Sequence, residues 1–504
     1  MSMLQNTIKL TLALYNNHHI PAKQLMIFKS YVPYLQKKIA IEFYEVPDSS
    51  IIDRVNLVME ENKNPLKPLS IEHLRFKHYE RSCGFVNPES YEIGTELIFE
   101  IVSSLVICVK RVKRYSVFMP IRNTWKNFLE TPNLFHEVMS YTKSFENENF
   151  IVSNIIQGSH SGEKELGVLY LGLPFLSPHL VAKLTNIYAV GHRKSIGSKR
   201  VCHKVIDELN KLCRDGIALN TNGTTVTVYF RCPLVLGDNL GLNCICDFVE
   251  SFSATRTVQN YGQDVQKKSI TTGVKTECVF NQLIYFHIVE NRTLDIMHDL
   301  FEGVVHYTLS KILTCLIFGN KLLSLDMLNR RISEFYFGEV EINKPRPIYK
   351  ESAKVNVNDI VKNKIKIKQS SAEMLCLCRY LGVIIGDLIP GNNRYWKLYL
   401  TLREIIGIVT APRYNIADIS QLRFLVHLHN ESYIQLFGKL KPKMHFLIHF
   451  AEIMLDNGPV IHFWSMPYER RNKILKEIAI SSRSHRNISL MMEFVINCSN
   501  LTLK

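Results

Sequence analysis

The sequence predicts the fold class α/β plus α, an α/β core joined to a large helical block, and two patterns indicate the core. Residues 166–171 (LGVLYL) and 224–230 (TTVTVYF) have strand patterns, and the second follows the hairpin dipeptide Asn222-Gly223. Residues 204–213, which lie between them, have the apolar spacing of an amphipathic helix. A strand, a helix and a strand in succession favour an α/β core.

The helical block is the third observation. Residues 299–318, 372–385 and 394–409 all have apolar side chains at three- and four-residue spacing. The chain then ends in an apolar-aromatic segment and a basic helix. We therefore expect four regions: a mixed, mainly helical N-terminal region (1–150), a first part of the core that is truncated (151–300), a helical insertion (301–455) and a C-terminal helix region with the last acidic residue (456–504).

Composition and charge narrow the classes of protein. The chain has 504 residues, 46% hydrophobic and 21% charged, with a net charge of +15. Such an excess of Lys and Arg suits DNA or RNA, although an anionic membrane surface or an ordinary basic protein are other readings. The most apolar run, residues 97–109, is shorter than the roughly 20 residues of a membrane span, so we expect a buried strand or helix there. We expect neither a secretory signal nor a membrane helix.

No zinc site is expected from the 12 cysteines. The close pairs Cys244/Cys246 and Cys376/Cys378 have C-x-C spacing, which differs from the C-x-x-C of zinc knuckles. His445 and His449 are spaced to share a helix face but lack an evident third ligand, which favours a structural role. The basic cluster 110–114 (KRVKR) suits either phosphate contact or a solvated patch.

Three segments carry a resemblance to a known family. They are residues 236–243 (LGDNLGLN), residues 294–304 (LDIMHDLFEGV), and residues 440–446 (LKPKMHF) with the following 457–459 (NGP) and 462–469 (HFWSMPYE). In this order they resemble transposase-derived proteins related to CACTA (EnSpm-like) elements, from about residue 65 to the C-terminus. The resemblance implies an RNase H-like mixed sheet core interrupted by a large all-helical insertion, DNA as the partner, and a nuclear rather than cytoplasmic location.

The resemblance also implies a chemistry and its residues. In this family three carboxylates hold Mg²⁺ ions that activate a water or a 3′-hydroxyl and stabilise the leaving oxygen of a phosphodiester. Asp238 matches the second aspartate and Glu469 the final glutamate, and both would bind metal. The alternative for Asp238 is a purely structural role, as the first residue of a turn-forming Asp-Asn pair.

Asp295 and His298 match an acidic-x-x-His signature of such transposases. His298 would orient DNA or tie down the insertion, and Asp295 is an alternative metal ligand. Beside Glu469, a basic set would face phosphates if the last helix lies along DNA; the alternative is a solvated helix face. That set is Arg470, Arg471, Lys473 and Lys476.

The first aspartate of the family is missing. Residues 154–158 resemble the part before its strand and residues 159–167 the part after it, as if the strand between had been lost. The nearest acids, Glu148, Glu163 and Glu165, lie at no convincing strand end. A cysteine knuckle that the family has after Ala254 is also absent.

Two of three carboxylates hold a two-metal centre poorly, so we expect no efficient strand cleavage or transfer. The sequence predicts a catalytically impaired transposase that binds nucleic acid, with magnesium only if activity is retained. One alternative is an active DDE-type enzyme whose first aspartate lies elsewhere, or was missed in the gene prediction near Gly158 or Ala254. Another is a protein-interaction scaffold built on the helical block. Self-association is open, and no small-molecule substrate is expected.

Overall fold

The computed structural model describes most of the chain between residues 86 and 481. The described residues are 86, 89–103, 106–118, 120–143, 155–160, 166–173, 176–177, 180, 188–193, 198–221, 223–249, 258–267, 273–339, 341–350 and 365–481. Glu148, Glu163 and Glu165 lie outside them. Statements below refer to the described residues.

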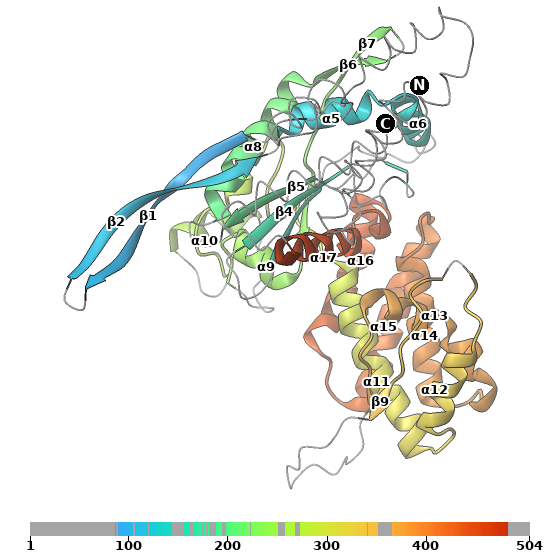
Figure 1. Cartoon of the computed structure of the whole chain (residues 1–504). Helices are drawn as coiled ribbons and strands as arrows, with labels where there is room; N and C mark the ends of the chain where they lie inside the picture. Colours follow the sequence, from blue (N-terminus) through green and yellow to red (C-terminus); the bar gives the residue numbers. More distant parts are fainter. Residues whose placement is uncertain are drawn as a thin grey trace, which may run out of the picture.

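A long β-hairpin opens the described chain and extends away from the rest of the molecule (Figure 1). Its antiparallel strands are β1 (Glu89–Ser103) and β2 (Val106–Phe118). In the described part of region 1–150 this hairpin has more residues than the helices α5 (Ile121–Leu129) and α6 (Leu134–Lys143). Most of that region lies outside the described residues, so its mainly helical character stays a prediction. Alternating β-branched and aromatic residues in both strands favour pairing over helix.

The core sheet has four strands in the order β5-β4-β3-β8. They are β3 (Ile155–His160), β4 (Leu166–Gly172), β5 (Tyr188–Arg193) and β8 (Leu234–Gly237). Strand β3 is antiparallel to β4 and β4 to β5, whereas β3 is parallel to β8. The sheet is therefore mixed, and its one parallel pair joins strands far apart in the sequence.

The junction that we expected to lack a strand forms β3, which is central in the sheet. Gly158 and Ser159, the residues at that junction, lie within β3 and pair with Leu169 and Val168 of β4. The residues on either side of the junction therefore provide enough extended chain to pair with two neighbours, whereas the loss of an acidic strand between them stays a prediction. What β3 lacks is an acidic residue.

One face of the sheet packs on helices from the first half of the chain. Leu169, Leu171 and Val235 belong to this core, together with Trp125 of α5. The main helix is α8 (Ser198–Asp215), which contains the predicted amphipathic segment. The remaining elements of this half are the hairpin β6 (Ile217–Thr221) and β7 (Thr224–Val228), the helices α9 (Asn239–Ile245) and α10 (Val258–Lys267), and the short helix η4 (Val279–Gln282).

The second half is a helical block with its own core. Its first helix runs without interruption from Met297 to Gly319, as η5 (Met297–Val305), α11 (His306–Thr314) and η6 (Cys315–Gly319). It continues with α12 (Leu325–Glu334), β9 (Tyr349–Lys350), β10 (Ile365–Lys366), α13 (Ser371–Ile385), η7 (Gly386–Leu388), α14 (Arg394–Val409), α15 (Ile416–Phe437), α16 (Pro442–Asn457) and η8 (Val460–His462). The three helices predicted from apolar spacing are confirmed.

The long first helix is the centre of this block. It is the one described helix long and apolar enough to cross a membrane. Most of its apolar stretch is buried, with Leu300, Leu309 and Leu313 fully covered by neighbouring helices. A buried position among helices from one chain accounts for its composition, which supports a mixed α/β protein whose apolar helices form its own core.

The last described helix, α17 (Met466–Ser481), returns to the sheet (Figure 1). Tyr468 packs against Tyr170 of β4, with ring centroids 5.9 Å apart. A Cβ on Gly172 would come within 1.9 Å of the Tyr468 hydroxyl, so only glycine allows this close approach. The sheet face opposite the α8 side therefore meets both the helical block and α17, and Leu234 and Leu236 of β8 belong to the core of the block.

Candidate functional site

Asp238 lies where the central parallel pair of strands ends. The strand that leads to it is β8, four buried residues, which belongs to a different sheet from β7. Its carboxylate accepts a hydrogen bond from the backbone N–H of Gly241 and caps α9. In open sheets, ligands commonly bind beyond the carboxyl ends of parallel strands, so Asp238 has both the expected position for a metal ligand and a local structural role.

The neighbouring strand carries no partner acid for Asp238. The parallel register pairs Gln157 with Leu236 and Gly158 with Gly237, so the next pair in this register is Ser159 beside Asp238. Strand β3 reads IIQGSH. A first metal-binding aspartate would be needed at the carboxyl end of this strand, where the sequence has Ser159 and His160.

Asp295 also comes close to the end of β8, but from a different segment of the chain. The backbone of residues 291–293 runs parallel to β8, with Val235 N–H donating to Asn291 O (2.8 Å) and Thr293 N–H to Val235 O (3.2 Å). The chain then reaches Asp295 and enters η5. The short parallel segment therefore delivers the D-x-x-H motif to the same edge of the sheet as Asp238.

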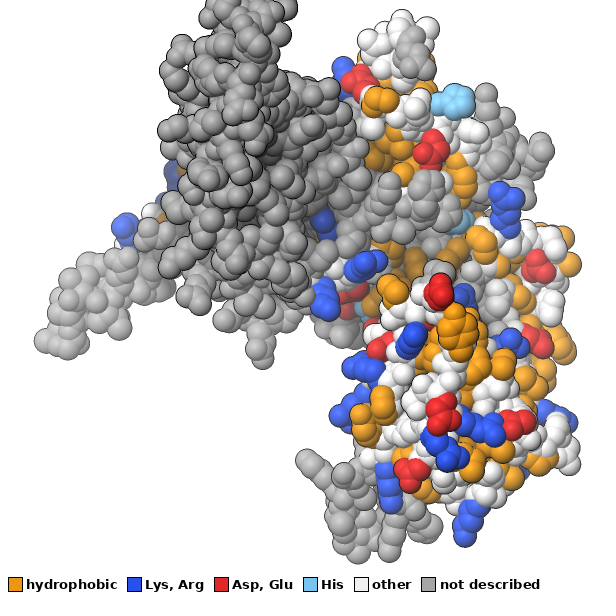
Figure 2. All heavy atoms as spheres, turned by 45° about the vertical axis from the view of Figure 1, so that its right-hand side comes forward, with side chains coloured by type: hydrophobic (Ala, Val, Ile, Leu, Met, Phe, Trp, Pro, Cys, Tyr) orange, Lys and Arg blue, Asp and Glu red, His pale blue; other side chains and the backbone are white. Residues whose placement is uncertain are grey.

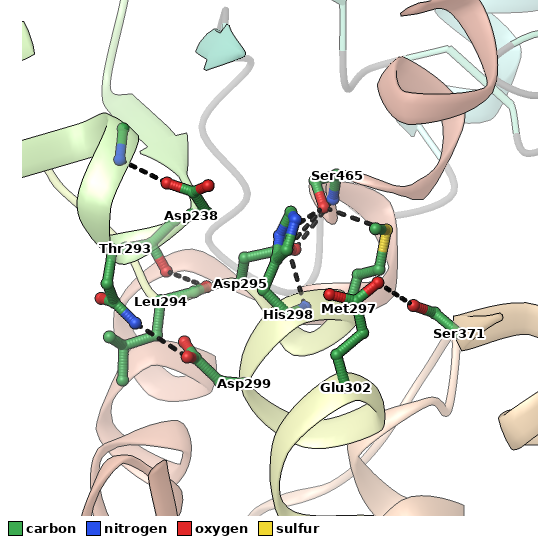
Figure 3. A network of polar contacts seen from close by, with 12 residues as sticks. Asp238, Thr293, Leu294, Asp295, Met297, His298, Asp299, Glu302, Ser371 and Ser465 are labelled. Carbon is green, nitrogen blue, oxygen red and sulfur yellow. Dashed lines mark hydrogen bonds and ion pairs between the residues drawn. The ribbon is translucent and has the colours of Figure 1, made fainter. Parts of the chain in front are cut away.

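Asp295 is the centre of a buried polar network (Figure 3). Its side chain is 1% exposed. One oxygen accepts the backbone N–H of Ser465 (2.9 Å), and the other accepts Nδ1–H of His298 (2.5 Å) and the hydroxyl of Ser465. Both carboxylate oxygens therefore have hydrogen-bond partners within the protein, and the role of Asp295 as a metal ligand stays a prediction. We call Asp295, His298 and Ser465 the clasp.

Electrostatics within the clasp favour an ion pair. Burial alone would raise the pKa of Asp295, but the hydrogen bond and charge of His298 and the bonds from Ser465 hold it below its usual value. Burial alone would lower the pKa of His298, but Asp295, with smaller effects of Glu302 and Asp238, raises it to about 9. At neutral pH His298 is therefore an imidazolium.

His298 also joins the block to its own later helices. Its carbonyl accepts a hydrogen bond from Nζ of Lys443 on α16 (2.7 Å), and the Lys443 side chain crosses Gly303, where a Cβ would lie 2.4 Å from its Cδ. Glu302, one turn further on, accepts a bond from the Ser371 hydroxyl of α13 (2.8 Å). Of the two predicted roles of His298, tying down the helical block is the one that these contacts support.

Asp299 is a further buried carboxyl beside the clasp. Burial and the charge of Asp295 raise the pKa of Asp299 to about 7. Its Oδ1 accepts a bond from the Asn239 side chain of α9 (2.8 Å). Through this bond the start of the block contacts the residue that follows Asp238.

Glu469 lies on the first turn of α17. Its backbone N–H donates a hydrogen bond to the carbonyl of Ser465 (3.0 Å), so this helix follows directly from the clasp. Burial raises the pKa of the Tyr170 hydroxyl, and the charge of Glu469 adds to that increase. The contact between Tyr468 and Tyr170 brings this turn of α17 to strand β4, which is next to β3 in the sheet.

The basic residues after Glu469 do not share one solvent face. Arg470 and Lys473 are exposed, whereas Arg471 is 3% exposed. Residues three apart lie on one side of a helix, and the residue between them turns toward the sheet. The side chain of Arg471 is therefore buried within the protein, and its contact with phosphate stays a prediction. The side chain of Lys476 lies outside the described part of α17.

The magnesium that the resemblance implies stays a prediction. Among the described residues, no group of three or more His, Cys, Asp or Glu side chains is close enough to hold a metal ion. Asp238 caps a helix, Asp295 is saturated, and β3 has no acid. We therefore derive no metal-dependent step.

The paired cysteines and histidines lie on helices. Cys376 and Cys378 are buried in α13, and Cys246 is buried while Cys244 is exposed. His445 and His449 share a face of α16, with their Nε2 atoms 3.4 Å apart, and both are exposed. Their exposure differs from the buried role that we considered.

Ser465, Lys443 and Asn239 lie within the motifs of the sequence analysis, where the first two have no assigned role and Asn239 appears only in the turn-forming Asp-Asn pair. A structural role for Ser465 could have been inferred from the sequence, because a serine directly before a helix commonly caps its first turn. The other two act across the molecule, at sequence separations that no local pattern reports.

No family model matches the sequence, and no curated protein is significantly similar to it. Function is therefore argued from the arrangement described above.

Proposed function

We propose that this chain is a transposon-derived nucleic-acid-binding protein, a DNA transposase whose metal centre is incomplete. The observation that carries the proposal is the parallel pair β3–β8, which ends at Asp238 on one strand and at IIQGSH on the other. A two-metal centre needs carboxylates that converge from several strands. One acid at such a strand end, without a partner, is what remains when this chemistry has been lost.

The surrounding layout supports an RNase H-like core with a helical insertion. A mixed sheet with a central parallel pair is followed by a helical block, and a final helix returns to the sheet with Glu469. The clasp joins the first residues of the block to the residue before that helix. A net charge of +15 adds an electrostatic reason for a polyanion partner, with nuclear DNA as our proposal.

The binding half of the proposal is tested by salt dependence. We expect the full chain to bind a labelled 30-base-pair duplex in fluorescence anisotropy, with an affinity that falls steeply as salt rises because phosphate contacts release counterions. Absent binding, or binding that salt does not change, would contradict the proposal.

The catalytic half is tested with supercoiled plasmid in Mg²⁺ or Mn²⁺. We expect no nicking. Nicking that Asp238→Asn abolishes would instead support an active DDE-type enzyme, and this substitution retains a good helix cap, so a loss of activity would not reflect unfolding. Amplifying the native transcript across Gly158–Ser159 separates the two further: a longer product that encodes an acidic strand would support the active enzyme.

A second candidate function is a protein-interaction scaffold, and one observation favours it. Hydrophobic side chains lie on the outside of the helical block (Figure 2). On α15 and α16 the exposed ones are Ile416, Phe424, Leu428, Ile434, Ile448 and Leu455. Sedimentation of the full chain would show whether they support self-association, and Phe424→Lys would then return the particle to the mass of a monomer.

A further inference from the structure

The hairpin β1–β2 is anchored at its base, and its strand β2 also contacts β5 of the core sheet. At the base, Phe118 is fully buried, meets the ring of Tyr91 edge-on at 6.4 Å and lies under Lys204 (5.2 Å). A strand of its length spans about 45 Å, and Figure 1 shows the hairpin leaving the body of the protein. We call residues 89–118 the arm.

The cations of the arm differ in whether they are paired. Lys113 forms an ion pair with Glu92 across the arm (2.9 Å). Lys110 and Arg111, closer to the tip, are exposed, and no ion pair involves either of them within the described residues. Successive residues of a strand point to opposite faces. The arm therefore presents one unpaired positive charge on each face at the same level.

One face of the arm combines cations with apolar groups. Val109, Arg111, Lys113 and Tyr115 alternate along β2 and so share a face, and Val109 and Tyr115 are 55% and 56% exposed. Leu97, which pairs with Arg111, is 51% exposed. A free two-stranded ribbon that keeps such residues in water is marginally stable by itself. Residues 97–109, the apolar run that we expected to be buried, therefore have an exposed side chain at each end, Leu97 and Val109.

We propose that the arm is a DNA-contacting β-ribbon that enters the major groove of a duplex, with Lys110 and Arg111 reaching the phosphates of its two walls. The major groove is wide enough for a two-stranded ribbon. Charges on both faces suit a groove, which has a phosphate backbone on either side, whereas a flat anionic surface would be met by one face. This inference rests on the proposed nucleic-acid function and assigns its contact surface outside the strand-end site.

The test compares two double variants of the full chain that remove the same charge. One is Lys110→Ala/Arg111→Ala in the arm, and the other is Arg330→Ala/Lys344→Ala, two exposed cations of the helical block. Binding to the 30-base-pair duplex is measured by anisotropy over a range of salt. Loss of two phosphate contacts lowers the slope of log affinity against log salt by about 1.8. We expect that decrease, with roughly tenfold weaker binding at low salt, in the arm variant alone.

Each outcome has one meaning. Wild-type protein that does not bind DNA overturns the proposed function and the arm together. Wild-type binding with equal effects of both double variants overturns the arm alone. If binding is unchanged but Leu97→Ser/Val109→Ser converts an oligomer to a monomer in sedimentation, the arm is a contact between copies and the inference is wrong. Circular dichroism of both variants confirms that the fold is retained.

Discussion

The two halves of the molecule use polar residues in opposite ways. In the α/β half, Asp238 lies at a strand end, is partly exposed, and has one described bond that caps a short helix. In the helical half, Asp295 is buried and has every oxygen bonded. Both belong to motifs of the same family resemblance, yet one is open to a ligand and the other is closed. A motif therefore identifies the residue, and burial decides what the residue can do.

The largest expected effect comes from breaking the closed site. Asp295→Ala leaves an imidazolium and two groups of Ser465 without their acceptor, which costs about 3 to 5 kcal/mol because one partner of a buried pair is removed. The free energy of unfolding in urea measures it. Asp456→Ala, an exposed acid at the end of α16, is the control and stays within about 0.5 kcal/mol. Equal effects would mean that the clasp is dispensable.

The next effect is a pH dependence confined to the same site. The folded protein holds the His298 proton up to a pKa of about 9, above the unfolded value of 6.5. Its contribution is complete below pH 6.5 and is lost as pH rises to 9, a change on the order of 2 to 3 kcal/mol. Urea unfolding at pH 7 and pH 9 measures it, and His298→Gln removes this part of the slope. Asp299, with a raised pKa of about 7, contributes a decrease of the same sign that is complete by pH 7 to 8.

A smaller effect tests how closely the block is packed at the clasp. Gly303→Ala forces Lys443 away, because the new Cβ would lie 2.4 Å from its Cδ, and the bond to the His298 carbonyl is lost. We expect a loss of about 1 to 2 kcal/mol in thermal or urea unfolding. In a Lys443→Ala background the same change has space and becomes neutral or stabilising. A loss of equal size in both backgrounds would refute this contact.

The smallest expected effect is at Asp238, where two substitutions separate the negative charge from the helix cap. Asp238→Ala removes the cap of α9 and costs about 1 kcal/mol, whereas Asp238→Asn is close to neutral. Unfolding of the three proteins under one condition measures this difference. If Asp238→Asn stabilises the fold markedly, the carboxylate is strained and its placement reflects a ligand that is no longer bound.

Periodic elements could be predicted from the sequence. The helices over 204–213, 372–385 and 394–409 and the 224–230 strand follow from apolar spacing or β-branched content, both of which act locally. The strand β8 was missed because four apolar residues are too few to distinguish a buried strand from a loop. Strand β3 was missed because it depends on pairing with β4 and β8, which lie far away in the sequence.

The sequence indicated which residues belong to the site, but not how they are buried and hydrogen-bonded. Asp238, Asp295 and His298 lie near one another beyond the end of β8 (Figure 3), whereas Glu469 follows Ser465 on the first turn of α17. Whether Asp295 is a ligand or a buried partner depends on Ser465, 170 residues away. Arg471 gives the same lesson, since a run of basic residues on a helix looks solvated until the face that meets the sheet is known.

The clasp has a consequence for the way the chain is assembled. The helical block leaves the sheet at Asp295 and returns at Ser465, and these two residues are in direct contact, with N–H and carboxylate 2.9 Å apart. A segment whose ends meet can be inserted or exchanged with little effect on its host, as domain insertions commonly are. Residues 295 and 465 are close enough for a short turn to join them, but removing the block would uncover Leu234 and Leu236 of β8, so the sheet depends on the block for part of its cover.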